Sequence, residues 1–98
     1  MTVHPIYLVY GDEQLLVRER CAEIVERALA GGTAAFNHTV GSAADGDVAG
    51  LLIQAQTVPM MAERRVVEIR ELERANADAL DLLLAYAQEP CATAALVL

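Results

Sequence analysis

The sequence predicts an α/β fold, a three-layer αβα arrangement built on a mainly parallel sheet. Short, continuously apolar runs that end in turn residues alternate with longer segments whose apolar residues recur every three or four positions. The resulting order, β-α-β-α-β-α-β, implies right-handed crossovers and a sheet covered by helices on both faces. With 98 residues, 55% of them apolar, the chain is long enough for one domain with one core.

The first strand is predicted over Ile6–Gly11, because IYLVYG is a continuously apolar run that stops at a glycine, which is typical of a buried parallel strand. Asp12 is expected to cap the following helix, with Glu13 in its first turn. The helix is expected to continue to about Ala30, where a glycine pair follows. Its apolar face is predicted to consist of Val17, Cys21, Ile24, Val25 and Ala28.

The middle of the chain predicts a short strand and a short helix. The strand is expected over Ala35–Val40. The helix is expected from about Val48 to Gln56, with Asp45 or Asp47 as its cap. Its apolar face is predicted to consist of Leu51, Leu52 and Ala55.

The last third of the chain repeats the alternation of strand and helix. VVEIR, residues 66–70, predicts the third strand, and TAALVL at the end predicts the fourth. Between them, ANADALDLLLAYAQ predicts a helix that begins at Asn76 or Asp78 and ends before Pro90. Its apolar stripe is expected at Leu80, Leu83, Leu84 and Ala87. Because the chain stops on a strand, we interpret it as a fragment of a longer protein.

Charge and composition narrow the range of functions. The net charge is −7 with only seven lysines and arginines, so a basic DNA-binding face is not expected. Cys21 and Cys91 lie far apart in apolar segments and are expected to be buried, reduced thiols. The N-terminus lacks the features of a signal peptide, and no stretch reaches the roughly 18 apolar residues of a membrane span. A cytoplasmic protein without membrane contact is therefore expected.

The turn after the first strand is where parallel α/β proteins commonly bind phosphates. A P-loop requires G-x-x-x-x-G-K-[ST], and counting from Gly11 places Leu16, Val17 and Arg18 at the second glycine, the lysine and the hydroxyl residue. None of these three positions carries the residue that the motif requires. The dinucleotide pattern G-x-G-x-x-G fails as well, because Gly11 stands alone. We therefore expect no nucleotide, no other cofactor and no ATP hydrolysis here.

Other sets of reactive residues are also missing from the sequence. Asp12 and Glu13 resemble the acidic pair of phospho-acceptor receiver domains, but EIREL at the end of the third strand has no acceptor aspartate, so helix capping is the better interpretation. His4 and His38 have no serine or cysteine beside them in a nucleophile motif, and we expect surface or edge histidines. No catalytic residue and no metal site is predicted.

The remaining unusual segment is QTVPMMAERR, in the middle of the chain. Pro59 suits the first position of a short helix, which would place Met60 and Met61 in its first turn. Adjacent helical residues point about 100° apart, so one core face does not easily bury both methionines. An exposed methionine pair with a charged rim that includes Arg64 and Arg65 fits a pocket on a partner. The alternative is that both methionines fill the core.

Four stretches along the chain are distinctive: YLVYGDEQLLVRE (7–19), FN (36–37), TVPMMAERRVVEIRE (57–71) and YAQEPCATAALVL (86–98). In this order they resemble the N-terminal domain of the delta subunit of the bacterial DNA polymerase III clamp loader. The most specific part is the P-x-x-x-x-R-R-V-V block combined with a P-loop position that lacks its lysine. The resemblance implies that residues 1–98 are one AAA+-like domain of a longer, three-domain chain, with a nucleotide-binding fold that has lost its P-loop.

The resemblance also implies a function. In this family the delta subunit binds the ring-shaped sliding clamp (the beta subunit) and opens one interface, without hydrolysing ATP itself. The contact is a short helix with two adjacent apolar residues, typically Leu-Phe, and a glutamine four positions earlier. The corresponding residues here are Gln56, Met60 and Met61, with Pro59 at the start of the turn. Met-Met in place of Leu-Phe removes an aromatic anchor, which is expected to weaken binding to the clamp or to alter the fit in its pocket.

The partners implied are the sliding clamp and, through an absent C-terminal part, the gamma/tau and delta prime subunits. DNA would be contacted only indirectly. The alternative function is a nucleotide-binding NTPase domain of the same fold, and a receiver-like phosphorylation domain is the third.

Overall fold

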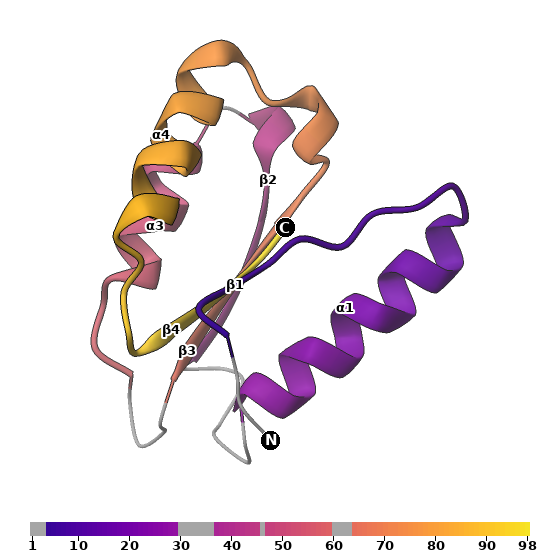
Figure 1. Ribbon diagram of the computed structural model, residues 1–98, viewed down its shortest axis with the longest axis horizontal. Coiled ribbons are helices and arrows are strands. Elements are labelled where there is room, and N and C mark those ends of the chain that lie inside the picture. Colours follow the sequence, from indigo (N-terminus) through magenta and orange to yellow (C-terminus); the bar gives the residue numbers. More distant parts are fainter. Residues whose placement is uncertain (1–3, 30–36, 46, 60–63) are drawn as a thin grey trace.

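The chain folds into strands and helices in the predicted alternating order (Figure 1). The computed structural model describes residues 4–29, 37–45, 47–59 and 64–98. Its main elements are β1 (Ile6–Tyr7), α1 (Gln14–Leu29), β2 (His38–Ser42), α3 (Val48–Ala55), β3 (Arg65–Arg70), α4 (Ala77–Gln88) and β4 (Ala94–Val97). Two short 3₁₀ turns, η1 (Ala43–Asp45) and η2 (Leu72–Arg74), follow β2 and β3.

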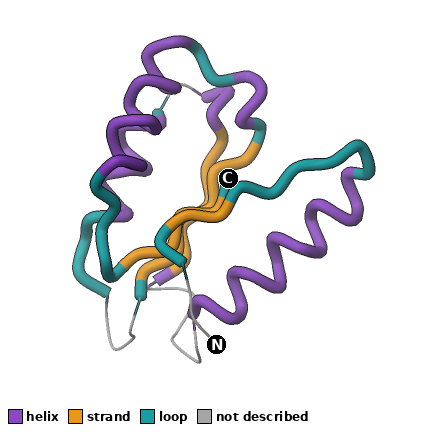
Figure 2. The backbone as a smooth tube through the Cα atoms, viewed as in Figure 1, coloured by secondary structure: helices purple, strands orange, loops and turns teal. Residues whose placement is uncertain are grey.

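The described strands form one parallel sheet in the order β1-β4-β3-β2. In its centre, Val66 of β3 pairs with Ala95 of β4, and Glu68 pairs with Val97. Figure 2 shows the strands gathered between the helices. The predicted parallel sheet is therefore confirmed, and the last strand of the chain lies inside the sheet instead of at its edge.

Helices cover both faces of the sheet. α1 packs on one face, while α3 and α4 lie next to each other on the other (Figure 1). Because strand residues alternate between the faces, Val66 and Val97 pack with α1, whereas Val67 and Leu96 pack with α3 and α4. The predicted three-layer αβα arrangement is confirmed.

The inner face of α1 is the predicted one. Ile24, Val25 and Ala28 are buried against the sheet, while Val17 and Cys21, nearer the start of the helix, are only partly covered. The helix therefore packs most tightly along its second half.

The start of α1 differs from the prediction. The helix begins at Gln14, and its first described backbone bond runs from the Val17 N–H to the Glu13 carbonyl, at 3.1 Å. Glu13 therefore takes the N-cap position, and no acidic residue lies in the first turn. The predicted cap, Asp12, is wrong, because it lies one residue before the place where helical hydrogen bonding begins.

The other two long helices have side-chain caps. Asp47 accepts a hydrogen bond from the Gly50 N–H (3.3 Å), and Asn76 accepts one from the Ala79 N–H (2.8 Å). The sequence left Asp45 or Asp47 open as the cap of α3, and Asn76 or Asp78 as the cap of α4. The structure selects Asp47 and Asn76. The predicted inner face of α3 is also confirmed, since Leu51, Leu52 and Ala55 are all buried.

The apolar stripe predicted for α4 is confirmed at Leu83 and wrong at its other three positions. The residues that α4 buries are Ala79, Leu83 and Tyr86. Of the predicted stripe, the residues found exposed are Leu80, Leu84 and Ala87. The Tyr86 hydroxyl accepts a hydrogen bond from the Cys91 N–H (3.3 Å) and so ties the helix to the loop before β4. This contact and the packing against α3 select one of two faces with similar helical spacing.

The first strand is shorter than predicted. β1 pairs with β4 over two residues, instead of over Ile6–Gly11. The Val9 N–H still donates to the Leu98 carbonyl at 2.9 Å, so the chain continues along β4 for a short distance. Leu8 is nevertheless exposed. Within the described residues β1 has a neighbouring strand on one side only, which leaves this run half covered.

The other strands lie near their predicted positions. β2 runs from His38 to Ser42 instead of over Ala35–Val40, and residues 35 and 36 lie outside the described part of the chain. β3 contains the predicted residues 66–70 and begins one residue earlier, and β4 confirms the final strand. None of the helices in the described ranges is both long and apolar enough to cross a bilayer.

Candidate functional site

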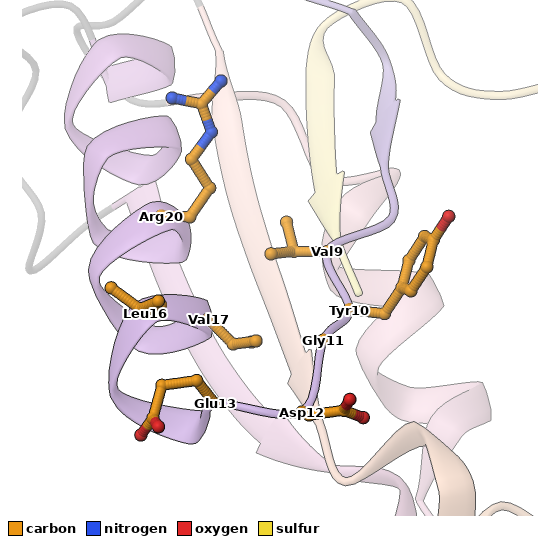
Figure 3. Close-up of a pocket in the computed structure, with 8 residues that line it drawn as sticks. All are labelled: Val9, Tyr10, Gly11, Asp12, Glu13, Leu16, Val17 and Arg20. Carbon is orange, nitrogen blue, oxygen red and sulfur yellow. The ribbon is translucent and has the colours of Figure 1, made fainter.

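The carboxyl edge of the sheet, where the strands end, contains the turn from β1 to α1. An open pocket of about 260 Å³ at this turn is lined by Val9, Tyr10, Gly11, Asp12, Glu13, Leu16, Val17 and Arg20. In the close-up, Val17 points from α1 towards Gly11, whereas Tyr10 points away from the helix (Figure 3). This is the turn at which a P-loop would lie.

Val17 stands at the position that a P-loop lysine would occupy. A Cβ atom added to Gly11 would lie 3.6 Å from Val17 Cγ2, which is ordinary van der Waals contact. The glycine is therefore not required by close packing at this turn. Where a phosphate site needs backbone N–H groups and an ammonium group, the turn presents an isopropyl group and the exposed carboxylates of Asp12 and Glu13.

The end of β3, also at the carboxyl edge, is occupied by Glu71. This residue has a φ of 56°, in the left-handed region. Its carboxylate accepts a hydrogen bond from Ser42 Oγ (2.9 Å) and lies 3.5 Å from Arg74 Nε. Glu71 thus joins the end of β2 to η2, and its contacts are those of a structural residue.

Glu68 is a buried carboxylate on the α1 side of the sheet. Its two oxygens lie 3.5 Å from His38 Nε2 and 3.5 Å from Arg70 Nε. These basic groups make the buried carboxylate tolerable, although His38 Nε2 forms no hydrogen bond. His38 is half-buried in the edge strand β2 and His4 is exposed, so the prediction of surface or edge histidines is confirmed.

A groove of about 1190 Å³ runs between α1 and the carboxyl half of the sheet, and Cys21 lines it. Burial, and then the negative charge of Glu68, raise the pKa of the Cys21 thiol. The thiol is therefore a poor nucleophile at neutral pH. Cys21 and Cys91 are free, as predicted, but only partly buried. In the described ranges no three histidine, cysteine or acidic side chains are grouped to hold a metal ion.

The amino edge, at the other end of the strands, contains the connection from α3 to β3. The Gln56 N–H donates to the Ile53 carbonyl (3.1 Å), and the Thr57 N–H donates to the Gln54 carbonyl (3.1 Å). The Thr57 hydroxyl also donates to the Ile53 carbonyl, at 3.1 Å. The chain therefore remains attached to the last turn of α3 as far as Thr57.

Arg65, the first residue of β3, reaches back across this connection. Its Nε donates to the Thr57 carbonyl and its Nη2 to the Val58 carbonyl, both at 3.3 Å. The residue is only 7% exposed, and its backbone N–H donates to the Thr93 carbonyl at 2.9 Å. The prediction that Arg65 joins Arg64 in an exposed charged rim is therefore wrong, because the Arg65 guanidinium is directed inwards to backbone acceptors.

Arg65 is the functional candidate that sequence reasoning missed. Side chains of a strand alternate between two faces, so Arg65 shares a face with the buried residues Val67 and Ile69. Extending the predicted third strand by one residue towards the N-terminus would have indicated a buried guanidinium beside the end of α3. A buried guanidinium requires hydrogen-bond acceptors, which the preceding carbonyls supply.

Two of the four predicted clamp-contact residues lie in the described part of the chain. Gln56 is exposed directly after α3, and Pro59 is half-buried and follows the exposed Val58. The predictions for Met60 and Met61 fall on residues outside the described ranges. The structure therefore brings Gln56 and Pro59 to the amino edge, next to the carbonyls that Arg65 holds.

Comparison with known proteins gives consistent results. Residues 7–98 match the family described as DNA polymerase III, delta subunit. Over 68 residues the chain is 32% identical to DNA polymerase III subunit delta of Bacillus subtilis (strain 168), which covers 69% of the chain and 20% of that protein. The solved structure of the Bacillus subtilis DNA clamp loader delta protein (YqeN) is similar with a TM-score of 0.79 and 27% identity. That match covers 97% of the chain and 31% of the solved chain.

Proposed function

The chain belongs to the family of DNA polymerase III delta subunits, components of the clamp loader in DNA replication, and on this premise we propose that it binds the sliding clamp and opens the ring. The proposed contact consists of Gln56, Pro59, Met60 and Met61, at the connection between α3 and β3. Met60 and Met61 are the apolar anchors, and Gln56 is the polar residue beside them.

The arrangement of the amino edge supports this proposal. Gln56 exposes its side chain while its backbone is hydrogen-bonded to the last turn of α3. The next two carbonyls are held by Arg65, so the start of the contact segment has a fixed position on the domain. A contact whose backbone is already ordered loses less conformational entropy on binding than a free loop. This attachment of the segment is the observation that carries the proposal.

To open the ring, the chain has to bind the open state of the clamp more tightly than the closed state. Burying one methionine side chain contributes about 1.5–3 kcal/mol, so two contribute on the order of 3–6 kcal/mol before the costs of association. Binding shifts the clamp towards the open ring only by the difference in affinity between the open and closed states. The methionines therefore need to fit better against the clamp surface when its interface is parted.

The remaining parts of the proposal concern the longer protein. The chain spans 20% of the length of the curated relative and 31% of the solved one. We propose that residues 1–98 are its N-terminal AAA+-like domain, which does not hydrolyse ATP, in a cytoplasmic protein that contacts DNA only indirectly. Assembly with the gamma/tau and delta prime subunits would use parts of the protein outside this sequence.

The direct test is to measure binding of the 98-residue chain to a purified bacterial sliding clamp. Changing both methionines, Met60→Ala together with Met61→Ala, should weaken binding at least about tenfold, because the buried apolar area is removed. The matched control is Leu84→Ala, which shortens an exposed apolar side chain on α4 and should leave the affinity unchanged.

Two outcomes would contradict the assignment. If the double methionine variant binds as tightly as the unchanged chain, the methionines are not the anchors. If the affinity falls steeply between low and moderate salt, charged groups and not apolar ones dominate the contact, since salt screens exposed charges and has little effect on apolar burial.

A further inference from the structure

We propose that Arg65 is a positioning residue for clamp binding: its buried guanidinium fixes the backbone at Thr57 and Val58, directly before the proposed contact residues Pro59, Met60 and Met61. This inference rests on the proposed function and names a residue outside the four contact residues. It comes from one geometric relation, the two hydrogen bonds that cross from the start of β3 to the end of α3.

The Arg65 side chain forms hydrogen bonds with backbone carbonyl groups of the connection from α3 to β3. The residue is 7% exposed, and in the described part of the chain its guanidinium donates to the carbonyls of Thr57 and Val58 at 3.3 Å. Removing a charge from water is costly unless its hydrogen-bonding groups are satisfied. The planar fork of arginine reaches two acceptors at once, which the point charge of lysine does not do.

The electrostatic setting favours this arrangement. The Thr57 and Val58 carbonyls follow directly after the last turn of α3, where the helix dipole places partial negative charge. The helix end therefore stabilises the Arg65 guanidinium through the carbonyl groups that it contacts. The same cation would be unfavourable at the N-terminus of a helix, where the partial charge is positive. The positive charge of Arg65 therefore suits its place at the C-terminal end of α3.

The two ends of the proposed contact segment are consequently joined to the sheet and to each other. On one side, Thr57 is bonded to the last turn of α3 through its backbone and its hydroxyl. On the other, the Arg65 N–H donates to the Thr93 carbonyl, beside the point where Arg65 pairs with Ala94 of β4. The guanidinium connects these two anchored points. Fixing the ends of a loop lowers the entropy that remains to be lost on binding.

Val58 shows how this arrangement affects side chains. Its carbonyl is held by Arg65, yet its side chain is 78% exposed. The guanidinium thus holds the backbone in place while the apolar side chain beside it stays outside the core. Pro59 follows immediately, so the carbonyl that Arg65 holds sets the direction in which the chain enters Pro59. Loss of the two hydrogen bonds would release this direction without removing any apolar contact group.

The test is a double-mutant cycle on clamp affinity, with the methionine double-alanine variant as the second change. Arg65→Met keeps the length of the side chain and removes its donors. It should weaken clamp binding about tenfold in the unchanged chain and less than about twofold when both methionines are already alanine. The matched control is Arg20→Met on α1, where the side chain is exposed and pairs only with the exposed Glu23 among the described residues, and the affinity should not change.

Arg65→Lys is the second variant and keeps the positive charge. It should fold, as judged by chemical denaturation, and still bind the clamp several-fold more weakly, because one ammonium cannot hold both carbonyls in the same geometry. If Arg65→Met does not fold, the cycle is carried out with Arg65→Lys. Wild-type affinity for the lysine variant would overturn the proposal.

The cycle separates the failure of this inference from the failure of the proposed function. If the methionine variant binds normally, the proposed contact itself is wrong. If the methionines matter but the effect of an Arg65 change is equally large with and without them, Arg65 acts independently of the contact segment. In that case it is a structural or direct contact residue, and the positioning role is overturned.

Discussion

The two edges of the sheet differ in how strongly the fold holds their connections. At the carboxyl edge, the turn from β1 to α1 lies where related architectures bind phosphates, but Gly11 stands alone and its neighbours are mostly exposed. At the amino edge, the connection from α3 to β3 matches no nucleotide motif, yet the buried Arg65 holds two of its carbonyls. Burial and hydrogen bonding therefore distinguish the amino-edge connection, although a nucleotide motif would be expected at the carboxyl edge.

The largest expected effect comes from the helix that supports the amino edge. Leu52 of α3 is buried, so Leu52→Ala should lower the free energy of unfolding by about 2–5 kcal/mol. Its neighbour Ile53 is 65% exposed, and Ile53→Ala should change the stability by less than about 0.5 kcal/mol. Chemical denaturation of both variants measures the difference. Equal losses would mean that α3 does not rest on the sheet through the described face.

A smaller effect is expected from changes at the starts of two helices, α4 and α1. Asn76→Ala should cost about 1 kcal/mol of stability, because the Ala79 N–H loses the side-chain acceptor 2.8 Å away. Asp12→Ala should cost less than about 0.5 kcal/mol, because Asp12 is exposed and lies before the cap position of α1. Urea denaturation gives both values. If the Asp12 variant loses as much as the Asn76 variant, the carboxyl-edge turn is held more firmly than the hydrogen bonds indicate.

The smallest expected effect concerns nucleotide at the carboxyl edge. A ligand present at 100 times its dissociation constant stabilises a protein by about 2.7 kcal/mol. With ATP and Mg²⁺ we expect no change in the melting temperature, since Val17 replaces the P-loop lysine and approaches Gly11. A P-loop NTPase domain measured in parallel serves as the positive control. A shift that requires Mg²⁺ would favour the alternative function, a nucleotide-binding NTPase domain.

Much of the local structure could be predicted because it depends on neighbours in the sequence. Apolar spacing identified the inner faces of α1 and α3, and short apolar runs identified the central strands. The caps of α3 and α4 were among the residues predicted, because an aspartate or asparagine side chain bonds to an N–H only three residues away.

The errors at α4 and at Arg65 fall where a residue's partner is distant in the sequence, whereas the predicted Asp12 cap is wrong by one residue. In α4 the sequence offers two apolar faces, and packing against α3, together with the bond between Tyr86 and Cys91, decides which one is inside. The reach of Arg65 to Thr57 and Val58 could not be read from charge alone, since an arginine beside an arginine resembles a solvated rim. The P-loop result needed no structure, because it depends on residue types at fixed spacing.

The alternating αβα class and the absence of a P-loop motif can be read from the sequence alone, which also predicts a contact at the segment around Gln56 and Pro59. The strand order β1-β4-β3-β2 and the inward direction of Arg65 appear only in the folded structure. The physical reason is that periodicity and motif spacing are local properties of the chain. Strand neighbours and buried hydrogen bonds are chosen by how all the elements pack together, which no single segment specifies.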